Sequence, residues 1–143
     1  GLGFIVSIHS YQLMGDSSGQ LNLTGPAVKA DGFYSFSDGI HTISAKLDNF
    51  TGRLFIEATL SLHATVNDWF PIMLSSMHPY MEYPANPQMP TGSRGDTVMD
   101  SFVIQGNFVF VRARINRDYV VPQPVTPDDL ALLGSVSQIL MNF

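Results

Sequence analysis

Short alternations of apolar and polar residues run through most of the chain, separated by clusters of Gly, Asn, Asp and Pro. Side chains of a strand point alternately to two faces, and these clusters favour turns, so the pattern is typical of an all-β sandwich or barrel. Helical periodicity is nearly absent. We predict an all-β fold, a single-domain antiparallel β-sandwich over residues 1–143, jelly-roll-like, with about eight strands.

Two hairpins are predicted from the strongest alternations. Residues 40–47 and 54–60 each alternate with period two and are separated by Asp48-Asn49-Phe50-Thr51-Gly52, a sequence suited to a reversal. Residues 102–104 and 108–115 flank a Gly-Asn pair in the same way. Within the first hairpin, we expect one face to point to the core, namely Ile43, Ala45 and Leu47.

The strand at 108–115 has two unequal faces. One carries small or branched residues, which are Val109, Val111, Ala113 and Ile115. The other combines aromatic rings with cations, which are Phe108, Phe110, Arg112 and Arg114. A guanidinium among aromatic rings can stack on them or bind a carboxylate, so we predict that Arg112 and Arg114 form structural or subunit-bridging ion pairs.

Two segments are irregular. Residues 75–95 contain four prolines, three methionines and two tyrosines without a repeating phase, which predicts a long loop that is either functional or ordered by a partner. Residues 122–143 form a Pro-rich C-terminal extension with a short helical turn after Thr126-Pro127, ended by Gly134, and a final strand. We expect both segments to contact neighbouring subunits.

The amino-acid composition favours some classes of binding partner and argues against others. Only 13% of the residues are charged, about half the usual share, so part of an apolar surface is expected to meet another protein. The net charge of -5 and scattered Lys and Arg argue against nucleic acid. Cysteine is absent, which removes disulfides and thiolate sites. The sequence predicts neither a signal peptide nor a membrane span, because no apolar run approaches roughly 20 residues.

Catalytic chemistry has no positive signal. The histidines sit in separate segments without the spacing of a preformed metal site, at His9, His41, His63 and His78. Backbone-satisfied imidazoles are the alternative. Glu57 and Glu82 are the only glutamates and lie on different segments, and no nucleophile elbow, phosphate loop or dinucleotide fingerprint occurs. We expect no enzyme activity, no metal and no cofactor.

Three aromatic residues indicate an alternative function, which is carbohydrate binding. Trp69, Tyr80 and Tyr83 could stack on sugar rings as a carbohydrate platform, whereas burial preference favours Trp69 in the core, plugging the sandwich. Arg94-Gly95-Asp96 spells a tripeptide that integrins recognise on exposed loops, and a chance occurrence in a turn is the simpler interpretation.

Three distinct sequence blocks follow one another along the chain, at residues 49–60, 68–72 and 106–115. They read Asn-Phe-Thr-Gly and Ala-Thr-Leu, then Asp-Trp-Phe, then Gly-Asn-Phe followed by an aromatic residue, here Phe110, a branched residue and Arg-Ala. Over residues 31–116 the chain resembles a small virion protein of tailed phages, of the T4-like and cyanophage type. The resemblance carries no catalytic residues.

The resemblance implies a non-enzymatic structural component of a tailed-phage virion: a head decoration or cement protein, or a neck, tail or baseplate protein. Such a homo-oligomeric subunit would bind copies of itself and other virion proteins. Candidate contact residues are Arg112, Arg114, Met77, Tyr80, Tyr83, Met89 and Phe143. The alternative is a carbohydrate- or receptor-binding module of a tail or head fibre that binds a host-surface glycan. A metal enzyme of the cupin type is a third possibility.

Overall fold

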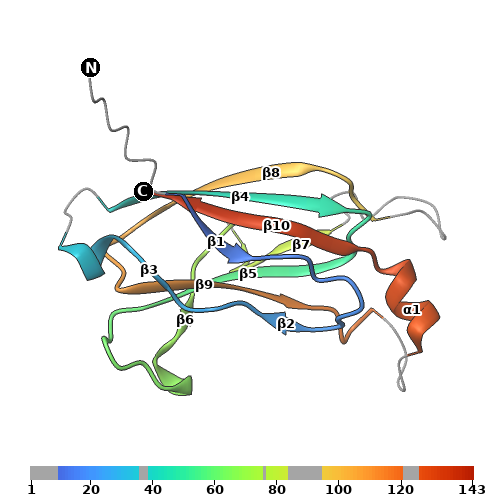
Figure 1. Ribbon diagram of the computed structural model, residues 1–143, viewed down its shortest axis with the longest axis horizontal. Coiled ribbons are helices and arrows are strands. Elements are labelled where there is room, and N and C mark those ends of the chain that lie inside the picture. The colour runs from blue at the N-terminus through green and yellow to red at the C-terminus, as the bar shows by residue number, and fades with distance from the viewer. Residues whose placement is uncertain (1–9, 36–38, 76, 84–94, 121–125) are drawn as a thin grey trace, which may run out of the picture.

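The computed structural model describes residues 10–35, 39–75, 77–83, 95–120 and 126–143. Two antiparallel sheets pack face to face, one above the other in Figure 1. The predicted all-β sandwich is therefore confirmed.

The upper layer, called sheet A, contains the first and last described strands side by side. Its order is β1 (Ser10–Met14), β10 (Ser135–Asn142), β4 (Ile40–Asp48) and β8 (Met99–Gln105). The β10 strand thus lies in the interior of sheet A, with antiparallel partners on both sides.

The lower layer, called sheet B, has the order β2 (Leu23–Thr24), β9 (Phe110–Asn116), β5 (Gly52–Thr59) and β6 (Phe70–Pro71). In addition, β3 (Val28–Lys29) pairs with β9, and β7 (Met81–Tyr83) pairs with β5. The β2 and β3 strands share one side of β9, and β6 and β7 share one side of β5. The strands therefore fill eight positions in the interleaved order of a jelly roll, as predicted.

The described residues include three short helical segments. They are the 3-10 turns η1 (Asp31–Tyr34) and η2 (Val66–Asp68) and the helix α1 (Pro127–Leu132). The η1 and α1 segments lie between strands of different sheets, and η2 lies between two strands of sheet B. The α1 helix begins at the proline after Thr126, and Gly134 follows it with a φ of 65°, which agrees with the predicted helical turn.

Both predicted hairpins are wrong. The β4 strand pairs with β10 and β8 in sheet A, whereas β5 belongs to sheet B. Likewise β8 and β9 lie in opposite sheets. Period-two alternation identifies the buried face of each strand. It does not identify the partner strand, because two strands in opposite sheets show the same alternation as two strands that pair within one sheet. The short connections therefore cross the sandwich instead of reversing within one sheet.

The crossings need backbone conformations with positive φ. Asn49 has a φ of 52° and Gly52 a φ of 151° between β4 and β5, and Gly106 has a φ of 153° between β8 and β9. A Cβ atom added at Gly106 would lie 2.5 Å from Cζ of Phe108. Glycine is therefore required there both by conformation and by space.

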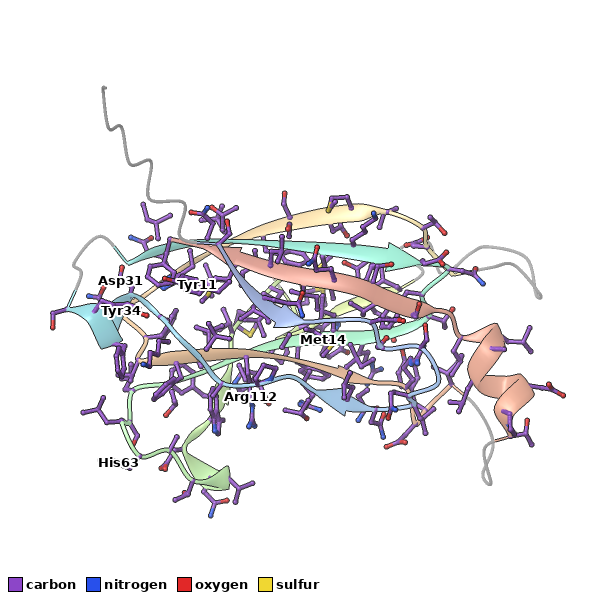
Figure 2. The ribbon with its side chains drawn as sticks, in the orientation of Figure 1. Tyr11, Met14, Asp31, Tyr34, His63 and Arg112 are labelled. Atoms are coloured by element: carbon purple, nitrogen blue, oxygen red, sulfur yellow. The ribbon has the colours of Figure 1, made fainter. Side chains whose placement is uncertain are left out.

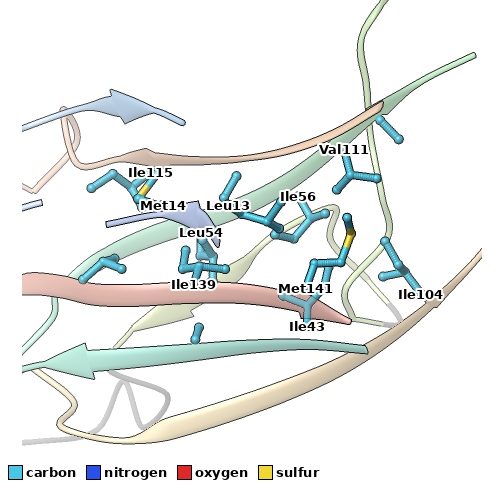
Figure 3. Packing of buried hydrophobic residues seen from close by; sticks show 14 of the residues in the cluster. Leu13, Met14, Ile43, Leu54, Ile56, Ile104, Val111, Ile115, Ile139 and Met141 are labelled. Carbon is cyan, nitrogen blue, oxygen red and sulfur yellow. The ribbon is translucent and has the colours of Figure 1, made fainter. Parts of the chain in front are cut away.

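The core lies between the two sheets, as Figure 3 shows. The predicted inward face of β4 is confirmed, because Ile43, Ala45 and Leu47 are at most 2% exposed. In contrast, residues 122–143 are not an extension throughout. The β10 strand contributes fully buried side chains to this core at Val136, Ile139 and Met141. A register shift between Val136 and Gln138 places Val136 on the same buried face as Ile139 and Met141, and the sequence pattern did not indicate this shift.

A buried arginine links the connections at one end of the sandwich. Arg117, which is 0% exposed, donates from Nη1 to the carbonyls of Leu133 and Gly134, each at 2.9 Å. Its Nε donates to the carbonyl of Leu21 at 3.1 Å, and its Nη2 donates to that of Gln20. Burial lowers the pKa of Arg117, and these carbonyls supply the acceptors that a buried cation requires.

A buried tyrosine links the sheets at the β8 side. Tyr83 of β7 is 1% exposed and donates its hydroxyl to Oδ2 of Asp100 on β8 at 2.7 Å. Burial first, and the bond to Asp100 second, raise the pKa of Tyr83 well above its ordinary value. The β7 strand lies within the segment predicted as irregular, residues 75–95, of which residues 76 and 84–94 fall outside the described part.

We expect Gly106→Ala to lower the free energy of unfolding by about 2 kcal/mol or more, because the new methyl overlaps Phe108 in addition to straining φ. Gly19→Ala is the matched control, since Gly19 also has a positive φ, 76°, but no atom lies within 4 Å of the position that its new methyl would take. Urea denaturation compares the two variants. Equal losses would show that the crossing at Gly106 tolerates a side chain.

We expect Tyr83→Phe to lower stability at neutral pH by about 1 to 2 kcal/mol through loss of the bond to Asp100. The folded pKa of Tyr83 lies above the unfolded value of about 10, so the wild type loses stability as the pH rises above about 10. The variant should lose less over that range. Denaturant titrations at several pH values measure this, with Tyr80→Phe as control, and identical alkaline slopes would contradict the expectation.

Candidate functional site

The outer surface of sheet B carries alternating cations and aromatic rings. Strand alternation turns Arg53, Phe55 and Glu57 of β5 and Arg112 and Arg114 of β9 away from the core. The antiparallel register places Glu57 opposite Arg112 and Phe55 opposite Arg114. Together with Trp69, Tyr80, Glu82 and Tyr119, these residues form what we call the arginine–aromatic face.

One glutamate holds two arginines at the centre of this face. Arg112 Nε lies 2.9 Å from Glu57 Oε1, and Arg114 Nε lies 3.2 Å from Oε2 of the same carboxylate. The Glu57 side chain is only 11% exposed, so water screens these contacts weakly. The predicted structural ion pairs of Arg112 and Arg114 are confirmed within the chain, and their role between subunits stays a prediction.

Each of these guanidinium groups also covers an aromatic ring. Arg112 Cζ lies 4.1 Å from the ring centroid of Trp69, and Arg114 Cζ lies 4.0 Å from that of Phe55. Figure 2 shows Arg112 on the side of β9 that faces away from sheet A. The prediction that Trp69 plugs the sandwich is therefore wrong. Its ring is half-buried on the outer surface, because a cation rather than the core supplies its packing partner.

The same combination recurs at the other end of the face. Arg53 Nε donates to Glu82 Oε1 at 3.1 Å, and Arg53 Cζ lies 4.6 Å from the ring of Tyr80 and 4.3 Å from that of Tyr119. The imidazole of His78 stacks on Tyr80 with ring centroids 4.8 Å apart. Both glutamates of the chain are thus paired with arginine.

This arrangement favours recognition over proton transfer. The two glutamates of the face pair with its three arginines and leave an excess of positive charge, so the groups left to contact a ligand are ring edges, ring faces and guanidinium N–H donors. Arginine and aromatic residues are commonly enriched in protein–protein interfaces, so a surface of this composition can contact another protein.

Exposed apolar side chains gather in the segment that contains Trp69. Residues 60–75 and 77, which include η2 and β6, are called the apolar arm, and the part around η2 projects from sheet B in Figure 1. Its large exposed side chains are Leu60 (64%), Leu62 (62%), Val66 (82%), Phe70 (38%), Met73 (58%) and Met77 (77%). The predicted contact residue Met77 belongs to it. No pattern argument identified the arm, since its apolar residues do not alternate regularly.

A pocket of about 530 Å³ lies at the α1 end of the sandwich. Hydroxyl and carboxyl groups contribute to its lining at Ser18, Asp48 and Thr97, together with Asn49, whose buried Oδ1 has no hydrogen-bond partner among the described residues. Gly95 is also in the lining, and a Cβ there would lie 2.3 Å from the carbonyl oxygen of Phe50. Only Gly95 and Asp96 of the Arg94-Gly95-Asp96 tripeptide lie in the described part, and the Asp96 backbone pairs with Phe50.

The remaining candidate contact residues have different positions. Tyr83 is buried under β8, so its predicted role in subunit contact or glycan stacking is wrong for this conformation. Phe143 is half-buried and stacks on Tyr11 with ring centroids 5.3 Å apart. Met89 lies outside the described residues. Tyr80 is half-buried on the arginine–aromatic face, so it remains available to a partner.

The described histidines do not converge. His41 is fully buried, with Nδ1 3.2 Å from the carbonyl oxygen of Gly39 and Nε2 accepting from the amide of Asp31 at 3.3 Å. His63 and His78 are exposed, and His9 lies outside the described part. Over the described ranges, no three His, Cys, Asp or Glu side chains come together in a group suited to a metal ion.

Comparisons with protein-family models, curated proteins and solved structures find no match to this chain. In the described part of the chain, no helix has the length and apolar character needed to cross a membrane. The functional interpretation therefore rests on the surfaces themselves.

We expect Arg112→Ala to lower the free energy of unfolding by about 1 to 3 kcal/mol, because Glu57 loses a charged donor and Trp69 loses its covering group. Glu57→Gln should cost a similar amount while keeping the side-chain shape. Lys46→Ala is the control, an exposed cation on sheet A expected to change stability by less than about 0.5 kcal/mol. Guanidinium denaturation measures all three, and an Arg112→Ala variant as stable as Lys46→Ala would refute the structural role.

Proposed function

We propose that this chain is a non-enzymatic structural subunit of a tailed-phage virion, acting through contacts with copies of itself and with other virion proteins. The observation that carries the proposal is the apolar arm, where six large apolar side chains are between 38% and 82% exposed within residues 60–75 and 77. So many exposed apolar side chains on one segment are expected where another protein covers the surface.

The rest of the molecule supports this proposal. A jelly roll without cysteine is held by a continuous core, by Arg117 and by the Glu57 ion pairs, so it offers a stable body on which surfaces can be displayed. The low charged share of 13% leaves large uncharged areas. The ordered sequence blocks that resemble phage virion proteins supply the assignment to a particle, whether in the head, neck, tail or baseplate.

The test uses particles of the phage that encodes this chain. We expect the protein in purified particles by mass spectrometry, in a fixed copy number, and a density map should show the apolar arm covered by a neighbouring protein. Val66→Asp, which places a charge on the arm, should reduce incorporation at least tenfold. Asn67→Asp adds the same charge at an adjacent exposed polar position and should be incorporated normally.

Particles that lack the protein would refute the proposal, as would normal incorporation of Val66→Asp. The alternative, a carbohydrate- or receptor-binding module, is favoured by the half-buried rings of Trp69 and Tyr80 beside arginine donors on one face. A glycan array that gives binding by the wild type, lost in Trp69→Ala but kept in Val66→Asp, would establish that alternative.

A further inference from the structure

The β8 strand is a long, regular sheet edge. It pairs with β4 along seven consecutive positions, from Met99 opposite Lys46 to Gln105 opposite Ile40, without a register shift. Sheet A ends at β8, and no element in the described ranges pairs with its other side. In Figure 1 β8 is the uppermost of the labelled strands.

The direction of the free backbone groups follows from the ladder. The amide of Leu47 donates to the carbonyl of Val98 at 2.9 Å, and the amide of Gly106 donates to that of Gly39 at 2.8 Å. In an antiparallel pair, successive residues of a strand direct their N–H and C=O groups alternately to one side and the other. The odd-numbered residues of β8 therefore direct theirs to the free side, at Met99, Ser101, Val103 and Gln105.

This edge lacks most of the usual protection against pairing. Proteins commonly protect edges with lysine, proline, bulges, short strands or inward-pointing charges. The β8 strand contains no cation, no proline and no bulge, and its one charged residue, Asp100, turns inward to accept the Tyr83 hydroxyl of the same chain. The opposite edge of sheet A, β1, is interrupted by a register shift between Gln12 and Met14, and the edge strands of sheet B have two or three residues.

We propose that β8 pairs antiparallel with β8 of a second copy of this chain, about a two-fold axis at Phe102. In this register Met99 faces Gln105 of the partner subunit, and Ser101 faces Val103 of the partner subunit. The odd-numbered residues then exchange hydrogen bonds in both directions across the interface. The two A sheets become one continuous sheet.

The strand is complementary to itself. Asp100 falls opposite Ile104 of the partner subunit, so no like charges meet. Side chains at the free edge are substantially apolar and exposed, with Met99 at 65% and Val103 at 70%. Phe102, which is only partly buried against the core, lies at the axis and would pack on its symmetry mate. An isologous contact needs this match of one surface with itself.

The β8 contact adds to the proposed function by naming one contact between copies. It rests on that function only in one respect, which is that a virion subunit needs such contacts. Purified protein tests it alone. We expect the wild type to have twice the monomer mass by light scattering during size-exclusion chromatography, with dilution producing monomer.

Ser101→Lys adds a charge at the free edge and should weaken the dimer at least tenfold by sedimentation equilibrium. Ser44→Lys is the matched control, because Ser44 lies directly opposite Ser101 on the same outer face but one strand inside the sheet. It should remain dimeric. Val103→Pro removes an N–H from the free side without touching the β4 ladder, so it should also be monomeric with unchanged circular dichroism and thermal unfolding.

A wild type that stays monomeric at millimolar concentration would overturn the proposal. So would an oligomer that survives both Ser101→Lys and Val103→Pro, because its contact would lie elsewhere. Equal weakening by Ser44→Lys would show that the outer face rather than the edge makes the contact. Each of these results leaves the presence of the protein in particles unaffected, so failure of the edge contact is distinguishable from failure of the virion assignment.

Discussion

The Arg117 guanidinium is the point on which the closed end of the sandwich depends. It binds carbonyls from residues 20 and 21, which lead into β2, and from residues 133 and 134, which lead into β10. Its own backbone follows β9, so one side chain joins the entrances of two strands to the exit of a third. Lysine cannot replace it, because an ammonium lacks the planar fork that reaches carbonyls on several sides.

Four of the five arginines have partners within the molecule. Arg112, Arg114 and Arg53 are each held by a glutamate and an aromatic ring, and Arg117 is held by carbonyls. Asp68 is the one Asp, Glu, Lys or Arg residue of the apolar arm, and Asp100 is the one charged residue of β8, so both surfaces are mostly uncharged. These are the surfaces through which we propose that the subunit makes its contacts.

Sequence reasoning identified the fold class, most strands and the core faces, because alternation directly encodes which side of a strand is buried. It predicted the wrong strand pairs. The alternating segments before Gly52 and Gly106 have the same pattern whether the chain reverses within one sheet or crosses to the other sheet. It anticipated ion pairs at Arg112 and Arg114 but not their shared partner Glu57, which lies 55 and 57 residues away in the chain. Trp69 was misplaced because hydrophobicity alone does not reveal a covering cation.

The interior position of β10 also has a consequence for synthesis. Until residues 135–142 have left the ribosome, β1 and β4 have no common neighbour, and each presents an open side. The nascent chain must keep these two unfinished strands apart from the synthesis of β4 until that of β10, and every pairing of sheet A around β10 joins distant parts of the sequence. Such a topology folds slowly, so the growing chain is vulnerable to mispairing until β10 emerges.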